Sequence, residues 1–181
     1  AFTRLTFSTF CFACLLITVV LPTSLQGEET VELTAKDKLV VETVLRLENF
    51  DLESSAPAKA AVLRYLRAKP GSDRYFELIE RFHPPEIAEP LVQYSIANAS
   101  DTGGVKGAEL LFAMKKGDSL AAITQSDNES NAQAAVQLIG HAAGNQTVSI
   151  LLPLLQTGTA TVAVRSAAVK ALGKQIGRAH V

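Results

Sequence analysis

Residues 164–173 read VRSAAVKALG, and this stretch indicates how the chain folds. Its AAV segment recurs at residues 60–62 and 134–136. A looser copy at residues 105–111 shares the basic second residue and the alanine at the fourth position. Small alanines let one helix approach its neighbour closely, and the large residues one turn away fill the groove between them. Repetition of such a segment predicts helices that stack on one another in pairs.

The rest of the chain shows helical spacing of apolar residues between capping and turn residues. Residues expected on the buried face of the first helix are Leu39, Val40, Val44 and Leu47. We expect helices near residues 35–48, 56–69, 73–82, 87–98, 105–114, 119–123, 131–142, 148–155 and 162–172. No segment of consequence alternates with period two, so the sequence predicts an all-α domain.

Residues 164–173 resemble the second helix of HEAT repeats, for which V-R-x-A-A-x-x-A-L-G is typical. The earlier copies depart from that pattern, because Met114 stands where Gly173 does and Asn131 replaces the valine. The resemblance implies a HEAT-like α-solenoid of stacked antiparallel helix pairs over residues 28–175, preceded by an N-terminal signal helix.

A narrower resemblance rests on residues 45–55 (LRLENFDLESS), 65–68 (YLRA) and 75–82 (YFELIERF). These segments are similar to exported bacterial proteins in which HEAT-like helices precede a C-terminal c-type cytochrome domain. Haem attachment in such a domain uses C-x-x-C-H, a motif that this chain does not contain. The resemblance therefore implies haem binding and electron transfer for sequence beyond this chain, and it assigns no haem ligand within it.

Residues 7–21 form an apolar run that follows a basic residue and ends at a proline. The run is shorter than the ~20 residues that a membrane-spanning helix needs. This layout is typical of a secretory signal peptide, which we place at residues 1–27 with cleavage after Gly27, or alternatively after Ser24. An uncleaved membrane anchor is the other interpretation. Export predicts a periplasmic or cell-surface protein with no stable membrane span after cleavage.

The cysteines Cys11 and Cys14 have the spacing of a redox pair, half a zinc site or a haem attachment. A redox pair lies at a helix start beside a βαβ pattern, and none is visible. A zinc site needs about four ligands, but the chain has no other cysteine, and His83, His141 and His180 are far apart in sequence. We therefore predict no metal site and expect both cysteines to leave with the signal peptide.

Four glutamates raise the question of paired catalytic carboxylates: Glu77, Glu80, Glu86 and Glu89. Acid–base catalysis needs two carboxyl groups facing one cleft. Because Arg74 and Arg81 are close in sequence, we expect ordinary ion pairs instead. The Gly103–Gly104 pair lacks the strand, third glycine and lysine of a phosphate-binding loop, and we expect a flexible turn there.

The net charge of the chain excludes nucleic-acid binding as its main function. Without Arg4 and Arg178, 15 of the 17 basic residues remain beside all 18 acidic residues over residues 28–175, a net charge of −3. Nucleic acids and acidic membranes require a basic patch or stripe instead.

We expect no catalytic, cofactor-binding or metal-binding residue in this chain. The predicted function is a non-catalytic exported scaffold for a protein partner or a fused cytochrome domain; the alternative is an electron-transfer haemoprotein whose C-x-x-C-H domain follows.

Residues 176–181 (IGRAHV) match one reading frame of a common DNA-sequencing adapter. We therefore expect them to be an artefact, and we expect the natural protein to continue differently after Gln175.

Overall fold

The computed structural model describes residues 32–158 and 160–179, and each regular element in that part of the chain is a helix. The α-helices are α1 (Ala35–Arg46), α2 (Ala56–Ala68), α3 (Asp73–Phe82), α4 (Ala88–Ala97), α5 (Thr102–Ala113), α6 (Gly117–Ile123), α7 (Glu129–Ala142), α8 (Thr147–Gln156) and α9 (Val162–Ala179). Short 3₁₀ turns are η1 (Leu52–Ser54), η2 (Pro85–Ile87) and η3 (Gly144–Gln146). The all-α prediction is confirmed. The expected signal peptide, residues 1–27, lies outside the described residues.

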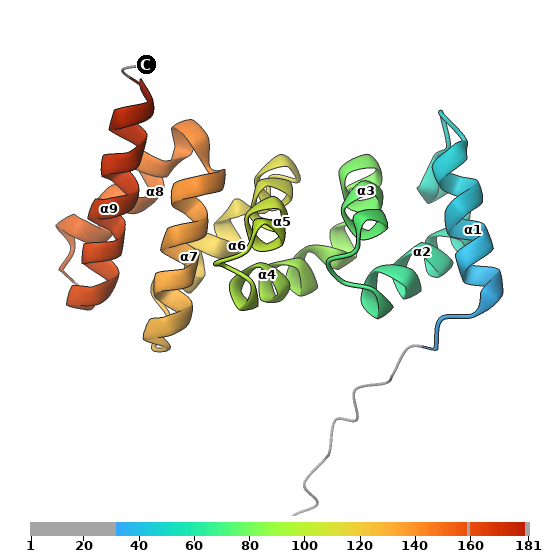
Figure 1. Ribbon diagram of the computed structural model, residues 1–181, viewed down its shortest axis with the longest axis horizontal. Coiled ribbons are helices and arrows are strands. Elements are labelled where there is room, and N and C mark those ends of the chain that lie inside the picture. The colour runs from blue at the N-terminus through green and yellow to red at the C-terminus, as the bar shows by residue number, and fades with distance from the viewer. Residues whose placement is uncertain (1–31, 159, 180–181) are drawn as a thin grey trace, which may run out of the picture.

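The helices are arranged so that the molecule extends in one direction, with α1 at one end and α9 at the other (Figure 1). Neighbours in sequence pack together, as α1 does with α2, α4 with α5, α6 with α7, and α8 with α9. Alternate helices also touch, because α3 contacts α5, α5 contacts α7, and α7 contacts α9. The helices α3, α5, α7 and α9 therefore form a row.

Side chains close in sequence set several helix starts. Thr34 and Asp37 form a capping box at α1, in which each side chain accepts a hydrogen bond from the other residue's backbone N–H. The Ser72 hydroxyl accepts a hydrogen bond from the Tyr75 N–H at the start of α3. Thr161 does the same for the Val164 N–H at the start of α9. Each of these bonds satisfies a backbone donor that lacks a partner within the helix.

The predicted buried face of α1 is partly wrong. Val41 and Val44 are buried, whereas Leu39 is 69% exposed and Leu47 is 47% exposed. The main neighbour of α1 is α2, and one neighbouring helix covers only a narrow stripe. That stripe runs through Asp37, Val41 and Val44, at the spacing of one helix face.

The turn expected at residues 103–104 is also wrong, because these glycines lie in the first turn of α5. A Cβ atom at Gly104 would overlap the backbone carbonyl of Asn98, and one at Gly107 would overlap the Ser95 hydroxyl. The absence of side chains thus lets α5 approach α4 at this crossing.

Two other helix starts differ from prediction. Helix α6 begins at Gly117, two residues before the predicted start, so Asp118 lies inside its first turn, where its negative charge is favoured by the helix dipole. Helix α8 begins at Thr147, one residue before the predicted start, and Asn145 belongs to the preceding η3. The helix then continues through Pro153 to Gln156.

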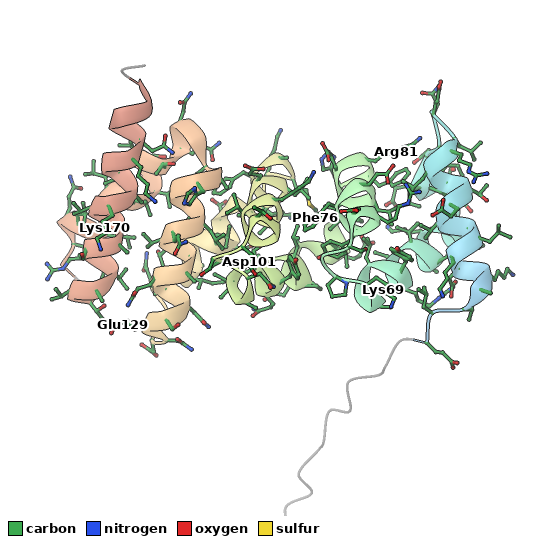
Figure 2. All side chains as sticks on the ribbon, viewed as in Figure 1. Lys69, Phe76, Arg81, Asp101, Glu129 and Lys170 are labelled. Carbon is green, nitrogen blue, oxygen red and sulfur yellow. The ribbon has the colours of Figure 1, made fainter. Side chains whose placement is uncertain are left out.

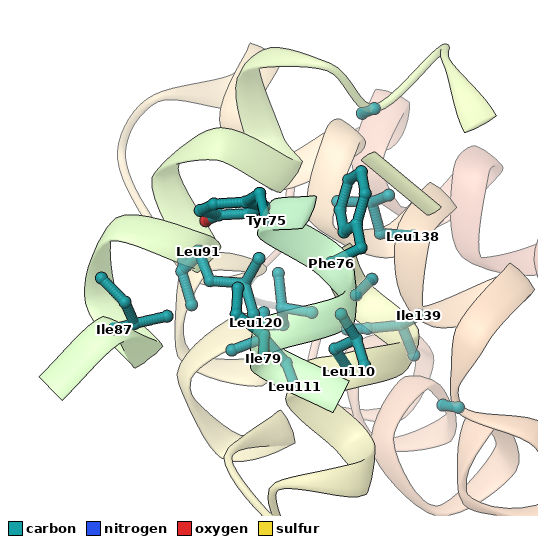
Figure 3. Close-up of a cluster of buried hydrophobic side chains, with 14 of the residues drawn as sticks. Tyr75, Phe76, Ile79, Ile87, Leu91, Leu110, Leu111, Leu120, Leu138 and Ile139 are labelled. Atoms are coloured by element: carbon teal, nitrogen blue, oxygen red, sulfur yellow. The ribbon is translucent and has the colours of Figure 1, made fainter. Parts of the chain in front are cut away.

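A continuous apolar core links the helices of the row to those behind it (Figure 3). Its fully buried members include Leu78, Ile79, Ile87, Leu91, Leu111, Leu120, Leu138 and Ile139. These residues come from α3, η2, α4, α5, α6 and α7. Burial of apolar surface stabilises the fold by about 25 cal/mol per Å². Because the buried side chains lie between helices, each helix is held in place mainly by packing against its neighbours.

Candidate interaction surface

Two grooves lie along the row formed by α3, α5, α7 and α9. The α7–α9 groove has a volume of about 520 Å³ and includes Lys170 in its lining. The α3–α5 groove has a volume of about 410 Å³ and includes Phe76. Both residues are labelled in Figure 2. These grooves are the candidate interaction surface.

The α7–α9 groove is polar and basic. From α7, Gln133, Gln137 and His141 line it at intervals of four residues, and from α9, Lys170 and Lys174 do so at the same interval. This spacing aligns each set along one side of its helix. No carboxylate is among the lining residues. The groove can therefore offer hydrogen bonds and positive charge to a ligand.

The floor of this groove is held by a close helix crossing. A Cβ atom on Gly140 would lie 2.6 Å from the Cβ of Ala171, so glycine is needed for this approach. The Gln175 side-chain amide donates a hydrogen bond of 3.0 Å to the Gly140 carbonyl. Behind it, the buried Thr147 hydroxyl donates to the Ile139 carbonyl at 3.2 Å. These contacts fix α9 and α8 relative to α7.

The α3–α5 groove has the opposite charge. Asp73, Glu77 and Glu80 line it together with the ring of Phe76. Lys106 reaches across from α5, 3.5 Å from the Glu80 carboxylate and 5.9 Å from the centre of the Phe76 ring. Three carboxylates thus face one lysine and the neighbouring Arg81 side chain.

Each glutamate that the sequence raised as a catalytic candidate has a polar partner. The pairs are Arg74–Glu77 at 2.7 Å, Lys106–Glu80 at 3.5 Å, Lys59–Glu86 at 2.6 Å and Gln93–Glu89 at 3.0 Å. Hydrogen bonding from Lys59 lowers the pKa of Glu86. Arg81 pairs with none of them and donates to the backbone carbonyls of Leu45 and Leu47, which joins α3 to the end of α1.

Asp37 and Arg64 form an ion pair that the sequence did not reveal. The Asp37 carboxylate is 2% exposed and lies 2.5 Å from the Arg64 guanidinium. Hydrogen bonds from Arg64 and then from Thr34 hold the pKa of Asp37 well below its usual range. Arg64 is 27 residues away from Asp37 in sequence, so only the fold brings the two charges together.

The histidines among the described residues belong to no metal-binding group. His83 is exposed and closes α3 in a left-handed conformation with φ of 46°. His141 lies in the last turn of α7, and His180 falls outside the described residues, as do Cys11 and Cys14. Over residues 32–158 and 160–179, no three His, Cys, Asp or Glu side chains come close enough to hold a metal ion.

Comparison with known proteins adds no relative. No family model, curated protein or solved structure matches the chain. Within the described residues, every helix is too short or too polar to cross a membrane. The class that the structure supports is therefore an all-helical protein with a polar, oppositely charged pair of surface grooves.

Proposed function

We propose that this chain is a non-catalytic scaffold, a HEAT-like α-solenoid that presents the candidate interaction surface to a protein partner. The observation that carries the proposal is the equivalence of the sequence copies in α7 and α9. Ala135 and Ala168 occupy the same position in the two copies, and both are fully buried. Helices that repeat in sequence and pack in succession are the basis of a solenoid.

The two grooves supply the partner-binding chemistry. The acidic α3–α5 groove and the basic α7–α9 groove lie at different points of one row, so a partner with a basic and an acidic segment fits them in one orientation. Complementary charges of this kind speed association and set its direction more than they add affinity.

One experiment tests both parts of the proposal. The tagged full chain is isolated from its native host with bound proteins, alongside the variants Lys174→Glu, Glu77→Lys and Lys116→Glu. We expect the first two to lose a partner that the unchanged chain retains. Lys116 is exposed and lines neither groove, so Lys116→Glu should retain it. Haem, a metal or robust hydrolase activity in purified residues 28–175 would contradict a non-catalytic scaffold.

The second candidate places this scaffold at the front of a larger exported c-type haem protein. Its support is the resemblance of residues 45–55, 65–68 and 75–82 to such proteins. Reading the genomic DNA beyond the codon for Gln175 tests it. A C-x-x-C-H motif in the same frame supports electron transfer, and a stop codon without that motif contradicts it. N-terminal sequencing of the secreted protein should start at Glu28 if the signal peptide is cleaved as expected.

A further inference from the structure

The shape of the α7–α9 groove suits an extended chain. Both of its walls, α7 and α9, belong to the described residues, and the α7 wall runs from Gln133 to His141, which is roughly 12 Å of helix. A volume of about 520 Å³ over that length corresponds to a mean cross-section of roughly 40 Å². A helix with its side chains is about 10 Å across or more and is too wide to enter. An extended chain fits, because it occupies about 4.8 Å by 10 Å.

The floor of the groove is made of small residues. Gly140, Ala167 and Ala171 are among its lining residues, and Gly140 and Ala171 are the two that meet at the close crossing of α7 and α9. Successive side chains of an extended chain point to opposite faces. Every second side chain of a bound segment therefore faces this floor and must be small, while the side chains between them face the rims.

The α7 wall offers hydrogen-bond acceptors at a regular interval. The amide nitrogen of Gln133 donates to the Glu129 carboxylate at 3.1 Å, and that of Gln137 donates to the Ala99 carbonyl at 3.3 Å. The amide oxygens of both side chains have no donor among the described residues. Four residues of helix rise about 6 Å, and the N–H groups on one edge of an extended chain repeat at about 6.6 Å. The two oxygens can therefore accept hydrogen bonds from two such N–H groups.

The α9 wall offers positive charge at the same interval. Lys170 and Lys174 are exposed, and within residues 32–158 and 160–179 neither forms an ion pair. No aspartate or glutamate follows Glu129 in the sequence, so carboxylates close in sequence do not neutralise them. Carboxylates at every second position of an extended segment repeat at nearly the spacing of these two lysines.

We propose that the α7–α9 groove binds an extended acidic segment of a partner protein, with carboxylates at every second position and small side chains between them. This inference rests on the proposed scaffold function and names the partner chemistry of one of its two grooves. The carboxylates pair with Lys170 and Lys174, and backbone N–H groups donate to Gln133 and Gln137. In such a site the main-chain hydrogen bonds provide affinity and the alternate side chains provide specificity.

Two labelled hexapeptides of equal composition and charge test the proposal. The first alternates glutamate with serine, and the second has three serines followed by three glutamates. Their binding to the full chain is followed by fluorescence anisotropy. We expect saturable binding of the alternating peptide that is at least about fivefold tighter than that of the second peptide, because only alternation matches both walls and the floor. This binding should weaken about fivefold between 50 and 300 mM salt, because salt screens the charges.

Matched variants of the full chain locate the binding. Lys170→Glu and Lys174→Glu should each weaken it at least about tenfold, because they replace attraction by repulsion. Ser166→Leu fills an exposed position in the groove without a change of charge and should also weaken it. Lys116→Glu and Ser149→Leu change exposed residues outside the groove and should leave it unchanged. Because all these side chains are exposed, the variants should remain folded.

Three results with these peptides would overturn the proposal. They are absence of binding, equal binding of the two peptides, and binding that survives Ser166→Leu, since the last two would show attraction by charge alone. The titration is repeated with the chain extended by its natural sequence after Gln175. Loss of peptide binding in that longer protein would assign the groove to the chain itself, and self-association that Lys174→Glu abolishes would assign it to a second copy. Either result would also overturn the proposal.

The scaffold function and this inference can fail separately. A native-host partner that is lost with Lys174→Glu, while the alternating peptide does not bind, would support the scaffold and contradict the extended acidic ligand. Peptide binding in the groove without any retained partner would do the reverse.

Discussion

Asp37 has two structural roles at one position. It closes the capping box of α1 with Thr34, and it pairs with Arg64 of α2. The capping box satisfies backbone N–H groups at the start of α1, and the ion pair links α1 to α2. One carboxylate therefore makes both a local and a tertiary contact. Its lowered pKa means that the carboxylate stays ionised in the folded state at pH values where it is protonated in the unfolded chain.

This difference predicts acid sensitivity. In the unfolded chain Asp37 titrates near its ordinary value of 3.8, so the stability that it contributes is present above that pH and is lost as the pH falls toward the lower folded pKa. We expect urea unfolding of the wild type to show a steep loss of stability below about pH 4. Asp37→Asn should be less stable at pH 7 and show a shallower loss on acidification. Asp127→Asn, a change in an exposed loop residue, serves as the control, and identical pH slopes in all three proteins would contradict the role of Asp37.

Ser95 is fully buried on α4, and its hydroxyl has no hydrogen-bond partner among the described residues. A buried polar group without a partner carries a desolvation cost. Ser95→Ala should therefore raise the free energy of unfolding by about 1 kcal/mol, measured by urea denaturation. A loss of stability would show that the hydroxyl has a partner, such as an ordered water.

At the scale of the helix, the glycine counterparts Gly140 and Gly173 give a matched comparison. Gly140→Ala inserts a methyl group against Ala171 and should destabilise the protein by about 1–3 kcal/mol through overpacking. Gly173→Ala meets open space and should stabilise it by up to about 1 kcal/mol, because alanine favours the helix. Thermal or urea unfolding of both variants measures the difference. Equal effects at the two positions would contradict the packing of α9 on α7.

Most helices could be predicted from sequence, because their signals are local. The Thr34–Asp37 capping box, the Ser72 cap and the Thr161 cap act within three residues of a helix start. The start of α5 at Thr102 could not be predicted, because two adjacent glycines are typical of a flexible turn. These glycines and Gly107 lie in the helix because α4 approaches α5 closely there. This contact is tertiary, so no local sequence pattern predicts it.

At the scale of the whole molecule, each helix is supported chiefly by its neighbours in the succession. Helices at the two ends have neighbours on one side only, so their local unfolding should cost less free energy than that of the centre. We expect amide hydrogen exchange to be slowest in α4, α5 and α7 and faster in α1 and α9. Mass spectrometry of peptides after exchange would measure this order. Uniform protection along the chain would indicate a single cooperative unit instead.

The candidate interaction surface was much less predictable than the helices. The sequence identified Glu77, Glu80 and His141 as residues to weigh, but it did not indicate that α7 and α9 enclose a basic groove or that Lys106 crosses to Glu80. Both features depend on which helices are adjacent. The spacing of residues within one helix says which side chains align, and it does not say what they face.

By itself the sequence determined the all-helical class and the approximate extent of the helices, because helical periodicity and capping act over three or four residues. The tertiary structure alone decided which side of α1 is buried, that Arg64 meets Asp37, and that Val136 is covered while Val169 is open. Those outcomes require segments tens of residues apart to pack together. Packing depends on shape and charge across the whole row of helices, and so the same sequence pattern is buried in α7 and exposed in α9.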